Sequence, residues 1–135
     1  MKFRKIEYND LNSRQKESYN FQKVSGLLAD YGFTTIRLSD DWQGADFIAQ
    51  HKSGTFIKVQ LKGRLTVDKK YINKDIWMCF KHQDKWYICL HDELLNILES
   101  VILKTKSWDK VDGKYSWVRP SKLLFNQIEN TLIEL

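Results

Sequence analysis

Three polar side chains in the first half of the chain are spaced so that they can meet at one point. Asp46 lies in a short apolar run, and Gln60 and Lys62 lie at the end of the alternating run Phe56–Lys62. Side chains of a strand alternate between two faces, so Gln60 and Lys62 share one face. A turn signal at residues 52–54 predicts a hairpin that brings Asp46 next to both of them.

An acid, an amide and a lysine at neighbouring strand ends are suited to bind a divalent cation beside a phosphate. In phosphodiester hydrolysis such an ion supplies a nucleophilic water, neutralises charge and assists the leaving oxygen. Mg²⁺ prefers oxygen ligands and keeps several waters, so one or two protein carboxylates suffice. We therefore expect Asp46 to bind Mg²⁺, for which Mn²⁺ can substitute. We expect further oxygens from Gln60 and the Leu61 backbone carbonyl, with Lys62 facing the phosphate.

A second carboxylate, Glu17, is placed to join this site from a helix. Helical spacing of apolar residues predicts a helix from about residue 13 to residue 31, which Gly32 terminates. Glu17 lies one turn before Phe21, on the side of the apolar stripe, where a carboxylate requires a partner or a metal. The alternative is an exposed first turn, in which Glu17 interacts only with the helix dipole. The candidate N-caps are Asp10, Asn12 and Ser13. The apolar stripe consists of Phe21, Val24, Leu27, Leu28 and Tyr31.

Basic residues are concentrated directly after the candidate site. The net charge of the chain is +5, which suits a polyanionic partner. We expect the basic run to contact a nucleic acid backbone, and Trp42, just before Asp46, to stack on a base or sugar. A solvated run without function, and a Trp42 that only packs, are the alternatives. The basic residues are Lys58, Lys62, Arg64, Lys69, Lys70 and Lys74.

The elements that must position these residues form a mixed pattern of helices and strands. Strands are predicted at residues 33–38, 44–49, 56–62, 75–80 and 85–90, the last two joined in a hairpin. Residues 40–44, with Asp40 and Asp41, are expected to form a solvated loop, with one aspartate serving as an outer acid of the site as the alternative. Residues 63–73 are expected to form a loop or sheet edge. Asp92 is expected to cap a helix that extends to Val101. A hairpin around Asp112-Gly113, within residues 107–118, and a last helix starting at Pro120 are expected to follow. The expected stripe of that helix is Leu123, Leu124, Ile128 and Leu132. This order predicts an α/β fold with a mixed central sheet flanked by helices.

The composition limits the class of protein. With 135 residues and 42% hydrophobic content, we expect one globular domain spanning residues 1–135. No apolar run approaches the ~20 residues of a membrane span, and the first eight residues do not resemble a signal peptide. We therefore expect a cytoplasmic protein without a membrane partner.

Cys79 and Cys89 are expected to be buried free thiols. No glycine-rich phosphate loop, histidine metal spacing or Ser-His-Asp arrangement is evident, so we expect no nucleotide cofactor.

Residues 13–64 resemble the PD-(D/E)XK nuclease superfamily, which includes restriction enzymes and Holliday-junction resolvases. The shared features are the helix with an early glutamate, the Tyr-Gly-Phe at 31–33, the Gly-Ala-Asp at 44–46 and the Val-Gln-Leu-Lys at 59–62. The resemblance implies a restriction-endonuclease-like αβββαβ core and a magnesium-dependent endonuclease that acts on DNA as a homodimer or tetramer. It also implies a site formed by Glu17, Asp46, Gln60 and Lys62.

Three features depart from the superfamily pattern. Gln60 replaces the usual acid, as in a bacterial group I intron homing endonuclease built on this fold. Ala45 replaces the usual proline, and no helix is evident between Lys62 and the strand at 75–80. Because a neutral amide binds metal weakly and cannot act as a base, a catalytically inactive nucleic-acid-binding or scaffold domain is the alternative function. A nuclease acting on RNA is a third possibility.

Overall fold

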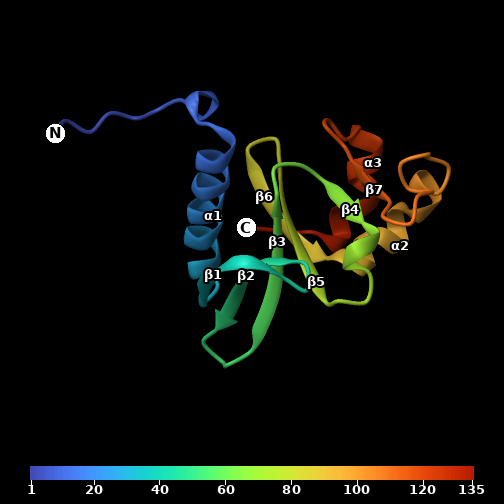
Figure 1. Ribbon diagram of the computed structural model, residues 1–135, viewed down its shortest axis with the longest axis horizontal. Helices are drawn as coiled ribbons and strands as arrows, with labels where there is room; N and C mark the ends of the chain where they lie inside the picture. Colours follow the sequence, from blue (N-terminus) through green and yellow to red (C-terminus); the bar gives the residue numbers. More distant parts are fainter.

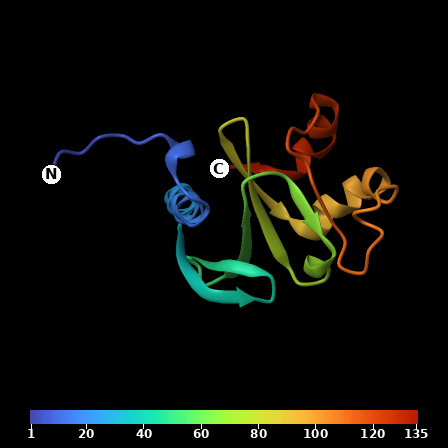
Figure 2. The same ribbon diagram turned by 45° about the horizontal axis from the view of Figure 1, so that its top comes forward.

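A six-stranded mixed sheet runs through the centre of the computed structural model, which describes residues 1–135. Its strand order is β1-β2-β3-β5-β6-β8. Helix α1 covers one face of the sheet, and α2 and α3 lie on the opposite side (Figures 1 and 2). The predicted α/β fold class, a mixed central sheet flanked by helices, is therefore confirmed. None of the helices combines the length and the hydrophobicity needed to cross a membrane.

The helices and strands have the following bounds. The α-helices are α1 Ser13–Ala29, α2 His91–Ile102 and α3 Lys122–Ile128, and the short 3-10 helices are η1 Tyr8–Asp10, η2 Lys69–Tyr71 and η3 Glu129–Thr131. The strands are β1 Phe33–Trp42, β2 Ala45–His51, β3 Phe56–Lys62, β4 Thr66–Asp68, β5 Ile76–His82, β6 Lys85–Leu90, β7 Lys114–Ser116 and β8 Ile133–Glu134.

The strand pairing determines which end of β3 is available for a functional site. Strands β1, β2 and β3 form an antiparallel meander, whereas β3 pairs with β5 in parallel. The link between β3 and β5 carries β4 and η2 instead of an α-helix. The αβββαβ order implied by the resemblance is thus altered here, since the next α-helix, α2, follows β6.

Two tight hairpin turns have the backbone conformation that two-residue loops require. Gln43 and Gly44 join β1 to β2 with φ values of 53° and 89°, and Gln83 and Asp84 join β5 to β6 with 48° and 62°. Positive φ at both central positions matches the right-handed twist of the flanking strands. The predicted loop at residues 40–44 is therefore wrong in extent. β1 continues to Trp42, which pairs with Ala45, and only two residues turn.

The core lies on both faces of the sheet. Beneath α1, Val24 and Leu28 pack in one cluster with Phe47 and Val59 of the sheet. On the other face, the core cluster includes residues of α2, α3, β4 and the β5–β6 hairpin. The predicted free thiols are confirmed, because Cys79 and Cys89 are buried and unpaired, and burial raises the pKa of both.

The segment at residues 63–73, predicted as a loop or sheet edge, contains the short strand β4 and is more buried than a surface loop. Leu65, Val67 and Tyr71 are fully or almost fully buried. β4 pairs with β7 in a separate two-stranded sheet, and this pairing replaces the predicted C-terminal hairpin. No hairpin is present at 107–118, where β7 is the one strand; Trp108 is buried, and Gly113 is packed against its backbone, where a Cβ would clash.

Several helix ends also differ from the sequence prediction. Helix α1 is capped by Asn12, one of the three candidates, but ends at Ala29 before Tyr31. Asp92 lies inside the first turn of α2 and does not cap it; its carboxylate accepts instead from the Asn73 N–H. Pro120 precedes the true N-cap of α3, Ser121.

The stripe predicted for the last helix is only half correct. Leu124 and Ile128 are buried, whereas Leu123 is 73% exposed. Leu132 lies beyond the end of α3, because the helix stops after two turns at Ile128.

Candidate active site

A polar pocket of about 540 Å³ opens beside α1, β1 and the ends of β2 and β3. All four side chains proposed for the site from the sequence line this pocket, and Asp40, Asp41 and Lys70 join them. The pocket therefore collects four carboxylates and two lysines from segments that are separated in the sequence. The residues shared with the prediction are Glu17, Asp46, Gln60 and Lys62.

The β2–β3 hairpin fixes Asp46 against the end of β3. Phe47 pairs with Val59, so Asp46 lies at the level of Gln60. Its Oδ2 accepts one hydrogen bond from the Leu61 N–H at 2.9 Å and another from Gln60 Nε2 at 2.8 Å. Oδ1 makes no hydrogen bond to the protein. The contact from Leu61 thus comes from its N–H group and not from the carbonyl that the sequence suggests as a ligand.

Gln60 is the most buried polar side chain of the pocket, with only 5% of its surface exposed. Its Nε2 is satisfied by Asp46, but its Oε1 is buried without a partner. A buried unpaired acceptor costs about 1–3 kcal/mol. An unpaired acceptor on an amide that lies beside a carboxylate favours an additional ligand.

The available donors fit a hard cation that retains much of its water. No group of three His, Cys, Asp or Glu side chains is arranged to hold a metal ion. The free oxygen of Asp46 and the unpaired oxygen of Gln60 are both hard donors. Glu17 lines the same pocket from α1. This set suits Mg²⁺, which needs few protein ligands.

The charges of Asp46 and Lys62 are both disfavoured by their surroundings. Burial raises the pKa of Asp46, an effect that the Leu61 N–H and the charge of Lys62 oppose and that Asp41 reinforces. Burial also lowers the pKa of Lys62, and the nearby charge of Lys70 lowers it further. Perturbed titratable groups that share a cleft are typical of functional sites.

Glu17 has features of both positions considered for it, an exposed first turn and a side chain at the site. It is exposed, as expected for a first turn in solvent, yet it borders the pocket. One turn later, Asn20 also lines the pocket and is 9% exposed, and its Nδ2 donates to the Tyr8 hydroxyl at 3.0 Å. No pattern in the sequence indicated Asn20, because an amide in a helix usually lies on the surface.

The two aspartates near the end of β1 were expected to lie in a solvated loop. Asp40 and Asp41 are exposed, but they belong to a strand that borders the pocket. The tight turn at Gln43-Gly44 brings this strand back alongside Asp46. That two-residue turn is the signal that could have linked Asp41 to the site.

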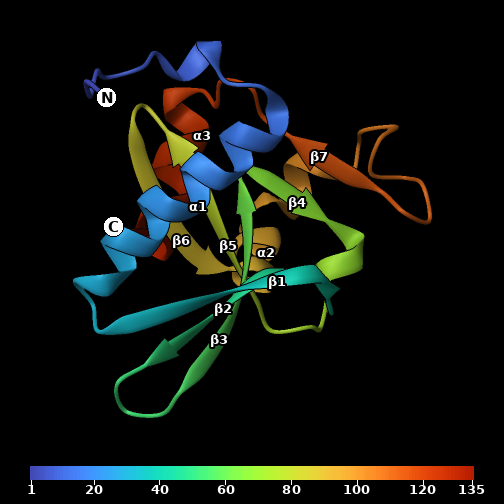
Figure 3. The ribbon, with the colours of Figure 1, turned by 60° about the vertical axis from the view of Figure 1, so that its left-hand side comes forward.

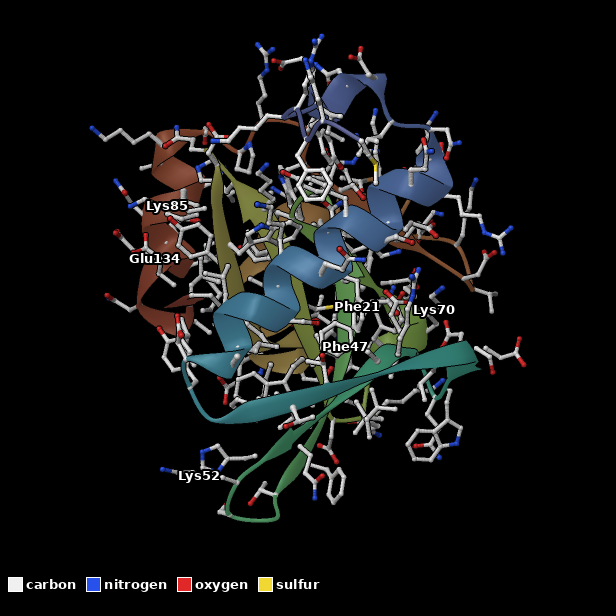
Figure 4. All side chains as sticks on the ribbon, turned by 90° about the vertical axis from the view of Figure 1, so that its left-hand side faces the viewer. Phe21, Phe47, Lys52, Lys70, Lys85 and Glu134 are labelled. Carbon is white, nitrogen blue, oxygen red and sulfur yellow. The ribbon has the colours of Figure 1, made fainter.

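The residues of the predicted basic run are divided between pockets and local contacts. Of its members, only Lys62 and Lys70 line the pocket, and Figure 4 shows Lys70 on the same side as Phe21 and Phe47 beneath α1. Arg64 lines a second pocket, and Lys74 is exposed before β5.

The other two lysines of the run make local contacts. Lys58 donates to Gln43 Oε1 at 3.2 Å and lies 5.9 Å from the ring centre of Trp42, which is 52% exposed. Lys69 donates to the Lys110 carbonyl at 2.9 Å.

The chain is similar to a solved structure but matches no protein family. No protein-family model matches the chain, and no curated protein matches it. A bacterial homing endonuclease, I-Ssp6803I, is similar in structure with a TM-score of 0.48 and 15% sequence identity. The similarity covers 82% of this chain and 78% of that chain.

Proposed function

We propose that this protein is a magnesium-dependent DNA endonuclease, a glutamine-containing variant of the PD-(D/E)XK type, which hydrolyses phosphodiester bonds in the Asp46 pocket. The observation that carries this proposal is the hydrogen bonding of the Asp46 carboxylate. One carboxylate oxygen is anchored by Leu61 and Gln60 and the other is free, while a partly desolvated Lys62 lines the same pocket.

The ligands proposed for Mg²⁺ are Asp46, Gln60, the Leu61 carbonyl and, from α1, Glu17. When bound, the ion would supply charge neutralisation at the phosphate and acidify a water molecule. Gln60 would take part through its unpaired Oε1, after a half-turn of its amide. This half-turn exchanges the positions of the amide oxygen and nitrogen.

The chain's own groups hold the reacting region in a fixed arrangement. The Leu61 N–H donates to Asp46 before any substrate arrives, so the carboxylate needs little reorganisation. Preorganised polar groups of this kind stabilise charge that develops in the transition state.

Lys62 is suited to bind the phosphate directly. Its Nζ makes no ion pair or hydrogen bond in the structure, and Lys70 lines the same pocket. The mutual repulsion of the two lysines would be relieved by a bound phosphate. In the poorly solvated pocket this attraction is stronger than in water.

Cleavage of both strands of a duplex requires two active sites. We therefore propose that the active form is a homodimer or a tetramer, as the resemblance implies. A nuclease acting on RNA would be distinguished by offering both nucleic acids to the same preparation.

The experiment is a cleavage assay on plasmid and branched DNA with Mg²⁺ or EDTA. The Asp46→Ala and Lys62→Ala variants are expected to lose cleavage while unfolding at a temperature close to that of the wild type. Asp109→Ala and Lys52→Ala remove the same charges at exposed positions outside the pocket and should retain activity. Full activity in both pocket variants would overturn the proposal.

A catalytically inactive DNA-binding domain is the second candidate. The hydrogen bond from Gln60 to Asp46 favours it, because the pair is connected without a metal. This function predicts no calorimetric signal with Mg²⁺ or Mn²⁺, together with unchanged DNA affinity in the Asp46→Ala variant.

A further inference from the structure

Gly63 lines two pockets and separates them. One is the candidate active-site pocket, and the other, of about 470 Å³, we call the second pocket. The lining of the second pocket includes Arg64, Lys81, His82, Trp117 and Arg119. It lies where β3 ends, at the turn of the β5–β6 hairpin and before α3, and these segments share one end of the molecule (Figures 1 and 3).

The protein's own packing does not require a glycine at position 63. A Cβ built on Gly63 would meet no heavy atom within 4 Å, and its φ is not in the left-handed region. Gly44 shows the contrast, since a Cβ there would lie 2.8 Å from the Tyr71 ring. A position that lacks a side chain without an internal reason leaves room for a ligand to approach the backbone closely.

The second pocket carries unpaired positive charge. Neither Arg64 nor Arg119 makes a side-chain hydrogen bond or an ion pair in the structure, and both are exposed. The single acid in the lining is Asp84, which already lies 3.7 Å from Lys81. Guanidinium groups bind phosphate oxygens in pairs of hydrogen bonds.

An aromatic side chain completes this lining. Trp117 is half-buried, and its ring is fixed edge-on against Tyr115 at 4.6 Å. A ring fixed in this way can stack on a base or a sugar of a nucleic acid strand.

We propose that a DNA strand bound at Lys62 crosses Gly63 and continues into the second pocket, where Arg64 and Arg119 bind its phosphates and Trp117 contacts a base or sugar. This inference rests on the proposed function for the identity of the strand. Lys62 and Arg64 are two residues apart, so their Cα atoms are separated by at most about 7 Å. That distance corresponds to about two nucleotides at the ~3.4 Å axial rise of one strand.

The test measures binding separately from cleavage. Fluorescence anisotropy of a labelled duplex is recorded in EDTA over a series of salt concentrations. Gly63→Leu is expected to weaken binding about tenfold or more, which is at least ~1.4 kcal/mol, without a change in the unfolding temperature. Gly26→Leu is the matched control, because a Cβ at Gly26 also meets nothing within 4 Å.

A second variant keeps the test decisive if Gly63→Leu does not fold. Replacing both arginines, Arg64→Ala with Arg119→Ala, should lower the slope of log affinity against log salt by about 2. The control, Lys52→Ala with Lys104→Ala, removes the same charge outside both pockets and should change the slope by less than half as much.

The outcomes separate this inference from the proposed function. If the wild type cleaves DNA and both second-pocket variants bind as the controls do, the strand path is wrong and the nuclease proposal stands. If the wild type binds DNA without cleaving it and the variants lose affinity, the strand path stands and the nuclease proposal fails. If the wild type binds no DNA, both are overturned.

Discussion

Gln60 donates a hydrogen bond from Nε2 to Oδ2 of Asp46 over 2.8 Å while its own Oε1 is buried without a partner. A half-turn of the amide would direct Oε1 at the carboxylate, where two acceptors repel each other unless a cation lies between them. The pair therefore has two arrangements, and a bound divalent ion would reverse the preference between them. This relationship connects the fold to the proposed chemistry.

Replacing Gln60 by glutamate should make the site more dependent on metal. Gln60→Glu places a second carboxylate in a buried position beside Asp46, so we expect a loss of about 1–3 kcal/mol in the free energy of unfolding without metal. Mg²⁺ or Mn²⁺ should restore most of this loss. Urea unfolding with and without the ion measures both effects. Gln50→Glu, at an exposed position on β2, is the control. Equal stability of Gln60→Glu and wild type in EDTA would contradict the buried site.

Asp46→Asn should not destabilise the protein at neutral pH. Burial raises the pKa of Asp46, which means that the folded state disfavours its charge. Asparagine keeps an oxygen that can accept from the Leu61 N–H, and it has no charge to desolvate. We expect the free energy of unfolding to rise by about 0.5–2 kcal/mol, as is common where function opposes stability. A clear fall in the unfolding temperature would show that the charge of Asp46 stabilises the fold.

Two glycine substitutions should separate backbone strain from a steric clash next to the site. Gly44 and Gly54 have φ values of 89° and 95°, so alanine is strained at both positions. Only at Gly44 does the added Cβ meet a neighbour, the Tyr71 ring. We expect Gly54→Ala to cost about 1–2 kcal/mol and Gly44→Ala a further ~1–3 kcal/mol. Because Asp46 is two residues away, Gly44→Ala should also reduce cleavage. Equal costs in thermal unfolding would contradict the packing of Tyr71.

His91 should make the fold sensitive to mild acid. It is fully buried, and its Nε2 accepts from the Asp68 N–H at 3.1 Å. Burial lowers the pKa of His91 below its ordinary value, against the opposing effect of Asp92. The unfolded chain therefore binds a proton at a higher pH than the folded protein does, and stability falls as pH drops through about 6.5.

The measurement for His91 is urea unfolding between pH 8 and pH 5. His91→Gln should flatten this pH dependence and cost about 1–3 kcal/mol at pH 8. The control is His82→Gln. His82 lies in the β5–β6 hairpin and is stacked on Phe125 of α3, and this variant should leave the pH dependence in place. A wild-type stability that does not change below pH 6.5 would exclude this role.

Local patterns explain what the sequence could predict. The period of two in β3 and the short β2–β3 turn placed Gln60 and Lys62 on one face, with Asp46 on the neighbouring strand. The central sheet followed from the same alternation, and α1 followed from helical spacing and its N-cap candidates. These features depend on residues close together in the chain, so they could be inferred without the tertiary structure.

Long-range contacts explain what the sequence could not predict. The pairing of β4 with β7 joins Val67 to Tyr115, which are far apart in the chain. The burial of Tyr71 was not predicted, because its neighbours in the sequence are basic; its ring packs under Gly44. Within the site, Asn20 escaped prediction because its position depends on how α1 packs against the end of β3.

Manganese binding shows whether a site that contains glutamine at position 60 holds a divalent ion. Mn²⁺ is titrated into wild type and Asp46→Asn, followed by electron paramagnetic resonance and calorimetry without DNA. We expect the wild type to bind Mn²⁺ at one site from which Mg²⁺ displaces it, and Asp46→Asn to lose this site. Equal Mn²⁺ binding by the two proteins, or no binding by the wild type, would contradict this expectation.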